Sequence, residues 1–364
     1  MEAPIPIDAL PESLNLECLA PTPIDALPES LILECLARLH LKDIPVASRV
    51  CHKWLHLIGS RHFYTLRKQL GFTNQVACLL QQSPSPTFFN LKYAINVFDP
   101  MNREWNRLPP IPNFTKELPG STSIASSEGK LVVLSECDPE SRDPVKSLFV
   151  LDFATQRWKK GKGMPSIRSS KFSTVASRSD RVFINGDLGR EEGAVWEYDA
   201  VWEYDAWKDE WTELHRVRGG QIIGMKVIGE ELWVIIGCRG IKNMGMIEGI
   251  GAEVYHLQTE NWRRVKLESG GVNELLCPCT DFELYELMKK LSENNFKVLE
   301  NCFRLQLGKQ SLLMAPFVTA ATLNEGYGQE ELFYMQFEDG SFERMQPSSS
   351  DFSGYVGSCC CVEL

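Results

Sequence analysis

The chain has 364 residues, of which 43% are hydrophobic, so it is long enough to bury the cores of a small and a large domain. Its formal net charge of −10 argues against binding of DNA or RNA through an overall positive field and favours a protein partner. No leader peptide is visible, and no apolar run approaches the roughly 18 residues of a membrane span. We therefore expect no membrane association and a location in the cytoplasm or the nucleus. The twelve cysteines lack the dense and even spacing of a secreted disulfide scaffold, which fits such a reducing compartment.

A doubled segment opens the chain, because residues 6–20 are repeated almost unchanged at residues 23–37. Only the second copy leads on to a further apolar pattern, whereas the first runs into Pro21 and Pro23, which end a helix. We expect residues 1–22 to be a disordered arm that holds a spare copy. The alternative is that this doubling, and a second one described below, are errors of gene modelling.

Two short amphipathic helices are expected from the second copy onward. The first starts at Pro28, and its apolar side carries Ile32, Leu36 and Leu39. The second is capped by Asp43 and has Pro45 in its first turn. Apolar residues at helical spacing follow along this second helix: Ala47, Val50, Cys51, Trp54, Leu55 and Ile58. Such a small module rarely sustains a core alone, so we expect it to bury apolar surface against a partner or a neighbouring domain.

This module resembles the F-box, which docks a Skp-type adaptor in SCF ubiquitin ligases. The resemblance rests on Leu27-Pro28, Leu31, Leu36, Leu39, Asp43 and the run VCHKW at 50–54. It implies an F-box over residues 23–65, followed by a linker at 66–75. It also implies a set of adaptor contacts, some of which must hold the module's own core: Leu27, Pro28, Ile32, Leu36, Val50, Cys51, Trp54, Leu55 and Ile58. The alternative is an ordinary helical hairpin that packs on the rest of the chain.

A repeat of about fifty residues fills the rest of the chain. Four segments place an apolar residue seven positions before a tryptophan, namely Phe98 before Trp105, Leu151 before Trp158, Tyr204 before Trp211 and Tyr255 before Trp262. Each segment predicts two strands joined by a turn, and the turn carries an Asp in three of them: Asp99, Asp152 and Asp205. Companion strands are predicted upstream at 131–136, 182–186 and 232–237. A four-stranded repeat of this length is typical of a propeller blade.

The repeat resembles the kelch repeat in its spaced aromatic pair, although the glycine doublet of that family is reduced to one glycine or none. A different propeller type therefore stays open. The spacing also decides the second doubling, in which VWEYDA occurs at 195–200 and again at 201–206. Tyr204, and not Tyr198, lies seven residues before Trp211, so we expect the downstream copy to form the strand.

A fifth segment at 332–345 aligns with the others, with Met335 in the place of Leu151 and Phe342 in the place of the tryptophan. Its greater distance from Trp262 predicts an insertion at about 268–300, with a helix at 282–291. Blade one lacks an opening strand, since residues 76–82 look like its second. We therefore expect the C-terminal strand, within residues 355–364, to complete blade one and close a five-bladed all-β propeller over residues 76–364. The last four residues, from Cys361, could instead be read as a prenylation box, but a buried strand would hide that cysteine.

The sequence offers no support for an enzyme. The propeller region holds only His215 and His256, too few histidines for a copper site, and Cys277 and Cys279 lack partners for zinc. No phosphate loop and no nucleophile motif is present. We expect no catalytic residue, no metal and no cofactor.

The small all-α module followed by the propeller resembles a plant-type F-box/kelch-repeat protein. The resemblance implies a substrate receptor that binds a Skp-type adaptor, and through it a cullin, while the propeller holds a protein target for ubiquitination and proteasomal degradation. Some relatives direct metabolic enzymes to destruction, which makes such an enzyme a candidate target, and no propeller residue is assigned to target binding. The rival interpretation is a non-catalytic kelch scaffold or inhibitor with no role in ubiquitin transfer.

Overall fold

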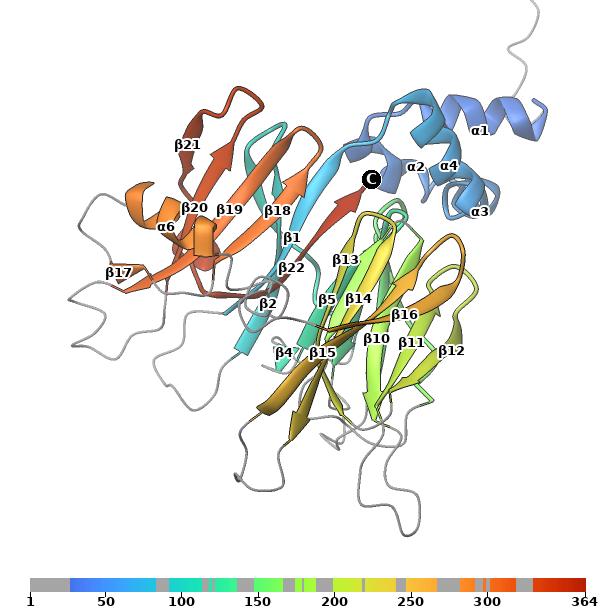
Figure 1. The fold of residues 1–364 in the computed structure, drawn as a ribbon. Coiled ribbons are helices and arrows are strands. Elements are labelled where there is room, and N and C mark those ends of the chain that lie inside the picture. The colour runs from blue at the N-terminus through green and yellow to red at the C-terminus, as the bar shows by residue number, and fades with distance from the viewer. Residues whose placement is uncertain are drawn as a thin grey trace, which may run out of the picture. The chain divides into compact units, whose positions relative to one another are not determined.

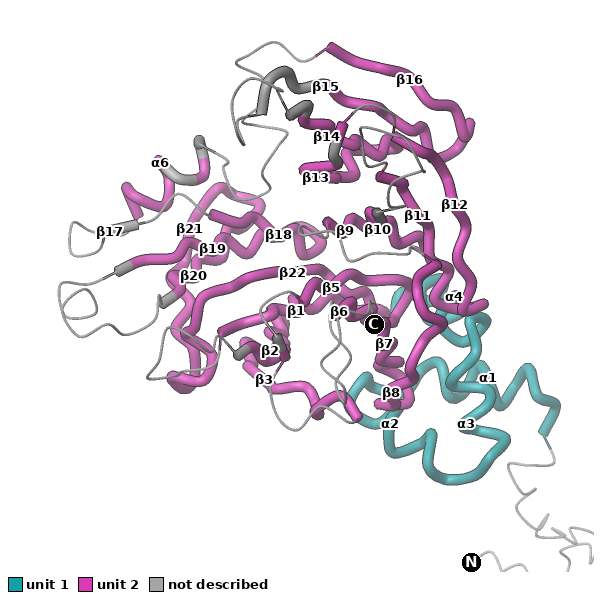
Figure 2. Tube along the Cα trace, turned by 90° about the horizontal axis from the view of Figure 1, so that it is seen from below, with its two compact units in different colours: residues 1–72 teal, residues 73–364 magenta. Residues whose placement is uncertain are grey.

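A computed structural model describes residues 27–82, 92–112, 118–119, 122–135, 147–165, 174–178, 180–187, 199–217, 220–239, 247–266, 282–291, 297–298, 302–318 and 330–364. The chain forms two compact units, residues 1–72 and residues 73–364 (Figure 2). The spare copy at 6–20, the residues Cys277 and Cys279, and most of the first VWEYDA copy lie outside the described residues.

The first unit is helical (Figure 1). Its elements are α1 (Glu29–Ala37), the 3₁₀ turn η2 (Leu41–Asp43), α2 (Ile44–Ala47), α3 (His52–Ile58) and α4 (Arg61–Leu70). Its core side chains come from all four helices and include Ile32, Leu36, Ile44, Ile58 and Phe63. Residues 66–70, expected in a linker, are the last turns of α4, which ends at Gly71 in a left-handed conformation.

The prediction of one continuous second helix through residues 47–58 is wrong, because the structure has two helices there, α2 and α3. After α2 the chain turns, with Ser48 Oγ donating to the Pro45 carbonyl at 2.8 Å. Cys51 is extended and caps α3, its Sγ accepting a hydrogen bond from the Trp54 N–H at 3.5 Å. Asp43 does occupy the N-cap position of α2, but its side chain makes no capping hydrogen bond.

The second unit is the five-bladed propeller that the repeat predicted. Among the described residues, blade one comprises β22 (Val356–Glu363), β1 (Gln75–Gln82), β2 (Lys92–Asp99) and β3 (Glu104–Arg107), with β4 (Leu118–Pro119) beside β2. Blade two runs from β5 (Thr122–Ser127) through β6 (Lys130–Ser135) and β7 (Ser147–Asp152) to β8 (Arg157–Lys160). Blade three is β9 (Val175–Arg178), β10 (Arg181–Asp187), β11 (Asp199–Asp205) and β12 (Glu210–Val217).

Blade four is formed by β13 (Gln221–Ile228), β14 (Glu231–Arg239), β15 (Ile247–His256) and β16 (Asn261–Lys266). In blade five, β17 (Lys297–Val298) and β18 (Phe303–Leu307) both pair with β19 (Gln310–Val318), followed by β20 (Glu330–Gln336) and β21 (Phe342–Met345). Serine hydroxyls join the first strands of successive blades, since Ser358 Oγ accepts from the Ile124 N–H and Ser177 Oγ from the Ser126 N–H.

The seven-residue spacing places each apolar residue opposite its tryptophan. The cross-strand pairs are Phe98 with Trp105, Leu151 with Trp158, Tyr204 with Trp211 and Tyr255 with Trp262. The predicted turn aspartates accept backbone N–H groups, for example Asp99 from Met101 at 2.8 Å and Asp205 from Trp207 at 2.9 Å. The downstream VWEYDA copy thus forms the paired strand, as predicted, and Asp199 and Ala200 from the upstream copy lengthen it.

The fifth segment differs from its predicted register by one residue. Phe342 pairs with Gln336, while Met335 lies opposite Glu343. The cause is a tighter turn, in which Phe337 N donates to the Ser341 carbonyl at 3.0 Å and Gly340 adopts a φ of 80°. One residue fewer in the turn shifts the opposite strand by one position and changes which side chains face each other.

The C-terminal strand closes the ring, as predicted. β22 pairs with β1 from Gln75 opposite Glu363 to Gln81 opposite Val356. Cys361 lies within this strand, and burial is the main cause that raises the pKa of its thiol to about 12. The strand interpretation of these residues is therefore the one that the structure supports, and the paired strand covers the edge that β1 would otherwise expose.

A helix, α6 (Phe282–Leu291), coincides with the residues for which the spacing predicts it. Its buried residues Leu284 and Met288 pack on a face of blade five that includes Leu313 and Phe317. The opposite face of the same blade packs against blade one, through residues such as Leu312 and Met314. Blade five is thus covered on both faces (Figure 1).

Candidate functional site

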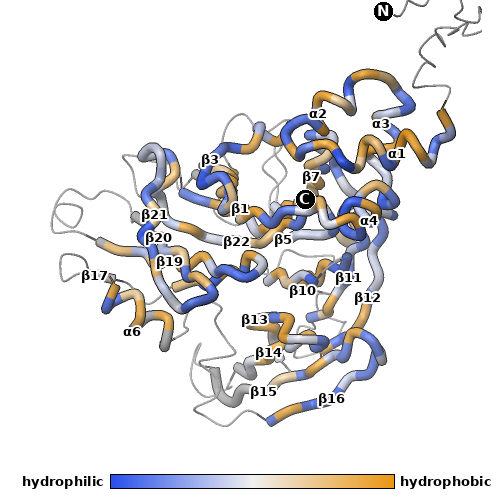
Figure 3. The backbone as a smooth tube through the Cα atoms, turned by 90° about the horizontal axis from the view of Figure 1, so that it is seen from above, coloured by the Kyte–Doolittle hydropathy of each residue, from blue (hydrophilic) through white to orange (hydrophobic). Residues whose placement is uncertain are grey.

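The first unit presents an apolar stripe along one side of α1. Pro28, Leu31 and Cys35 are exposed, and their spacing of three and four residues places them on one side of the helix. Ile32 and Leu36, on the other side, are 0% and 2% exposed and belong to the core. Figure 3 shows that α1 and α3 each carry both hydrophobic and hydrophilic stretches. α1 therefore holds the unit together with one side and offers apolar surface with the other.

Two valines add to the exposed apolar surface of this unit. Val46, in α2, is 65% exposed, and Val50, in the turn before α3, is 63% exposed, compared with 47% for Leu31. Each fully exposed valine or leucine that is buried by a partner would contribute about 1.5–3 kcal/mol. We call Pro28, Leu31, Val46 and Val50 the exposed apolar set.

The predicted adaptor contacts separate into three groups. Pro28 and Val50 are exposed, while Leu27, Cys51, Trp54 and Leu55 are half-buried. Ile32, Leu36 and Ile58 are at most 2% exposed and form the unit's own core, so they cannot touch a partner without unfolding. Leu31 and Val46 were missing from the predicted contacts. Both are apolar residues at positions that do not fit the spacing of the buried residues in their helices. That mismatch could have identified them from the sequence.

Arg67 holds the end of α1 in place. It lies in α4 and is only 4% exposed, and its guanidinium donates to the carbonyls of Ala37 and Leu39, each at 2.8 Å, and to the Phe72 carbonyl. Desolvation lowers the pKa of Arg67. A cation at a helix C-terminus satisfies carbonyls that lack partners within the helix. Arg67 thereby fixes α1, and with it Pro28 and Leu31, relative to α4.

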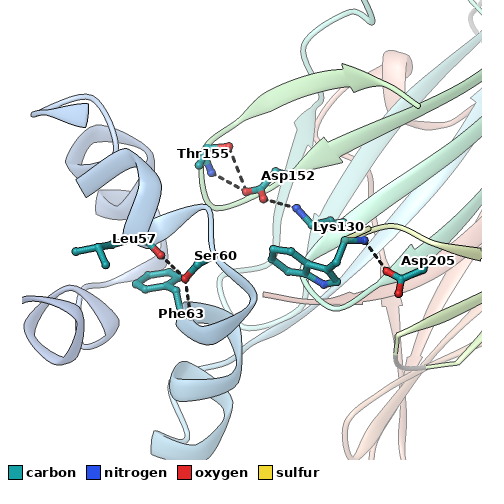
Figure 4. A network of polar contacts seen from close by, with 8 residues as sticks. Leu57, Ser60, Phe63, Lys130, Asp152, Thr155 and Asp205 are labelled. Carbon is teal, nitrogen blue, oxygen red and sulfur yellow. Dashed lines mark hydrogen bonds and ion pairs between the residues drawn. The ribbon is translucent and has the colours of Figure 1, made fainter. Parts of the chain in front are cut away.

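Ser60 sets the direction of α4 (Figure 4). Its Oγ donates to the Leu57 carbonyl at 2.6 Å and accepts from the Phe63 N–H at 3.1 Å. The same hydroxyl thus ends α3 and caps α4, which is a favoured use of serine. The capped turn fixes the angle between the two helices that carry Trp54 and Arg67.

Polar clusters in the propeller serve its architecture. Lys130 donates to Asp152 Oδ2 at 2.6 Å (Figure 4). Its Nζ lies 3.8 Å from the centre of the Trp207 ring in blade three. Asp152 also accepts from the Thr155 N–H at 3.0 Å. The two bonds to Asp152 lie within blade two, and the contact of Lys130 with the Trp207 ring joins blade two to blade three, so the cluster has the character of a structural contact.

A second cluster joins blades three and four. His215 Nε2 lies 2.6 Å from Glu253 Oε2, and its ring stacks on Trp262 with centroids 4.3 Å apart. Arg264 donates to the other oxygen of Glu253 at 2.6 Å. Within the described residues no group of His, Cys, Asp or Glu could hold a metal ion. None of the helices there is long and apolar enough to cross a membrane.

Comparison with known proteins identifies the helical unit. Residues 24–66 match the F-box domain model. The F-box/kelch-repeat protein At1g80440 of Arabidopsis thaliana is 32% identical over 49% of this chain and 51% of its own length. At1g15670, from the same plant, is 30% identical over 52% and 50%. A third Arabidopsis relative, SKIP20, is 24% identical over 71% and 66%. The matched part of the chain spans about half the length of the first two relatives.

Among solved structures, TolB from Acinetobacter baumannii is similar over 79% of this chain and 66% of that chain, at 11% identity and a TM-score of 0.34. At this score we infer nothing from the likeness. In this chain a region that matches the F-box is followed by a five-bladed propeller. The chain is similar in sequence to plant F-box/kelch-repeat proteins.

Proposed function

We propose that this protein is the substrate receptor of an SCF-type ubiquitin ligase in the cytoplasm or nucleus. Its F-box would bind a Skp-type adaptor, which bridges to a cullin, and its propeller would hold a protein target. The protein would supply proximity and no bond chemistry of its own, since holding target and ubiquitin donor in one complex replaces a bimolecular encounter. A metabolic enzyme is the target class that we favour.

The observation that carries the proposal is the exposed apolar set on a unit that matches the F-box. Apolar side chains at 47–65% exposure on so small a unit are costly to leave in water, and a partner that buries them gains their transfer free energy. The same unit keeps a complete core of its own, so the set is free to serve a partner.

Binding of a purified Skp-type adaptor to the full chain tests the first half of the proposal. Leu31→Asp should weaken binding at least about 30-fold, because it places a charge within a buried apolar contact. Gln69→Asp, an equal charge change at an exposed position of α4, should bind like the wild type. Deletion of residues 6–22 should leave binding intact. Failure of the wild-type chain to bind any adaptor would contradict the proposal.

The receptor function and the rival scaffold function predict different results in cells. A receptor should lower the abundance of the proteins that its propeller captures, and a proteasome inhibitor should restore them. The Leu31→Asp variant should capture the same proteins without lowering their abundance. If captured proteins are equally abundant with the wild type and the variant, the protein acts as a scaffold.

A further inference from the structure

A short basic segment lies at the start of α3 in the F-box unit. Arg49, His52 and His56 are exposed, and Lys53 between them is half-exposed. Within α3, His52 and His56 lie on the exposed side, and Lys53 lies at the border of the buried side, which carries Leu57 and Ile58 at 5% and 1% exposure. We call Arg49, His52, Lys53 and His56 the basic segment.

The charge of this segment is local and contrasts with that of the chain. Residues 27–72 contain seven Lys or Arg against three Asp or Glu, although the whole chain has a formal net charge of −10. Within this unit Arg38 pairs with Glu34 at 2.8 Å. No carboxylate among the described residues pairs with Arg49 or Lys53, so their charges are available to another molecule.

The basic segment is interleaved with the exposed apolar set. Val50, 63% exposed, follows Arg49 directly, and Val46, 65% exposed, precedes it by three residues. A surface that mixes apolar anchors with a cationic rim matches a protein interface, in which an apolar centre is surrounded by charged groups of complementary sign. A nucleic acid backbone would satisfy the cations but leave the valines in water.

We propose that the basic segment docks against an acidic protein surface, whose carboxylates border the apolar groove that receives the exposed apolar set. Resting on the function proposed above, this surface belongs to the Skp-type adaptor. Exposed charge pairs at the rim of an interface change the association rate and its salt dependence more than the dissociation rate. The exposed apolar set stabilises the complex, and the basic segment raises the association rate.

The test compares association kinetics of two charge-reversed full-length variants with a purified Skp-type adaptor at 0.05 M and 0.5 M salt. Arg49→Glu with Lys53→Glu should lower the association rate constant about tenfold at low salt, with little difference at high salt, where charges are screened. Lys226→Glu with Lys290→Glu is the matched control, since it makes the same change in net charge at two exposed positions of the propeller. The control should associate at nearly the wild-type rate.

Four results would overturn the proposal. Equal rates for the wild type and the first variant at low salt would show that the basic segment plays no part, while the adaptor-binding function would stand. An equal slowing of both variants would assign the effect to net charge. Tight binding of mixed-sequence duplex DNA that only the first variant loses would make the segment a nucleic-acid site. Failure of the wild type to bind the adaptor would remove both the proposed function and this inference, and circular dichroism of both variants controls for folding.

Discussion

Ile32 decides which copy of the doubled segment can serve as α1. The two copies, residues 6–20 and 23–37, differ at a single position, where the first has Asn15 and the second has Ile32. Ile32 is 0% exposed in the core of the F-box unit. An asparagine at that position would bury an amide without hydrogen-bond partners, which costs about 1–3 kcal/mol in addition to the lost apolar burial. The second copy is therefore the better α1 on physical grounds alone.

Ile32→Asn should unfold or loosen the F-box unit while leaving the propeller intact. We expect a loss of about 3–5 kcal/mol, from the lost burial and the unpaired amide together. Hydrogen exchange of peptides within 29–39 measures this directly, and their protection should fall. Leu31→Asn, at the exposed neighbouring position, should cost under about 1 kcal/mol. Equal protection of both variants would contradict the assignment of Ile32 to the core.

Glu331 is a buried carboxyl between blade five and the closing strand. It is 4% exposed, and its Oε2 accepts the Val356 N–H at 3.1 Å. Desolvation raises its pKa well above the usual value of 4.5, against the smaller opposite effect of that hydrogen bond. The folded protein thus holds this proton more tightly than the unfolded chain. Below pH 4.5 both states are protonated, and as the pH rises through the raised pKa the folded protein loses stability.

Glu331→Gln should remove that pH-dependent loss, because glutamine stays neutral and its oxygen can still accept from Val356. The melting temperature of the variant should equal that of the wild type near pH 4 and exceed it increasingly toward pH 8. Glu210→Gln, at an exposed position of β12, should follow the wild-type curve. Parallel curves for the Glu331 variant and the wild type would show that the carboxyl is not held neutral in the fold.

Among the elements, the turns between the last two strands of blades one to four share one backbone conformation. The residue two positions before each tryptophan has a positive φ, namely Arg103, Gln156, Asp209 and Glu260 at 55–58°. The left-handed region costs a non-glycine residue about 1–2 kcal/mol. This strain recurs in four blades because the turn length sets the register of the tryptophan pair.

Glu260→Gly should therefore stabilise blade four, by about 0.5–1 kcal/mol once the greater freedom of glycine in the unfolded chain is subtracted. Its neighbour Thr259 is the matched control, since it is also exposed and is not among the residues with positive φ. Thr259→Gly should destabilise the propeller. Denaturant midpoints of the two variants measure the difference, and a loss of stability in Glu260→Gly would contradict the argument.

The sequence alone predicts those elements whose pattern is local. The step from Phe98 to Trp105 and its equivalents located four hairpins, because spacing within a hairpin is set by a few turn residues. The fifth was misplaced by one residue, since the pattern does not reveal that Gly340 permits a shorter turn. The helix predicted across Cys51 was wrong for a similar reason. The apolar spacing runs through the break, and cysteine is a rare capping residue.

The candidate site was harder to predict than the fold. Core and interface both consist of apolar residues, so the expected adaptor contacts included Ile32 and Ile58 without separating the residues that hold the module's own core, and both are buried. Only packing in three dimensions separates them from Leu31 and Val46, whose exposure depends on how α1 and α2 meet the other helices. Arg67 carried no sequence signal at all, because its partners are carbonyls of Ala37, Leu39 and Phe72.

At the scale of the whole propeller, integrity depends on a strand from the far end of the chain. β22 reaches blade one from blade five by way of residues 346–355, and two side chains of blade one hold this connection. Gln81 Nε2 donates to the carbonyls of Phe352 and Gly354, and Asn96 Nδ2 donates to the Asp351 carbonyl. A side-chain-to-backbone hydrogen bond also joins blades three and four, where the Asp199 carboxylate accepts the Ile222 N–H at 2.6 Å. The ring is therefore closed by residues 346–355, whose backbone packs closely against blade one.

Gly354→Ala tests how much the propeller depends on that fit. A Cβ at Gly354 would lie 2.0 Å from the Gln82 carbonyl oxygen, so the connection and the start of β22 must shift. We expect a cost of about 1–3 kcal/mol, seen as a melting temperature lower by a few degrees, with faster hydrogen exchange in β22 and β1. Gly163→Ala, where nothing lies within 4 Å of the added Cβ, should leave both measurements unchanged. If only the exchange of β22 rises while the melting temperature holds, the strand can detach without opening the remaining blades. The closure would then be a local contact and not the element on which the ring depends.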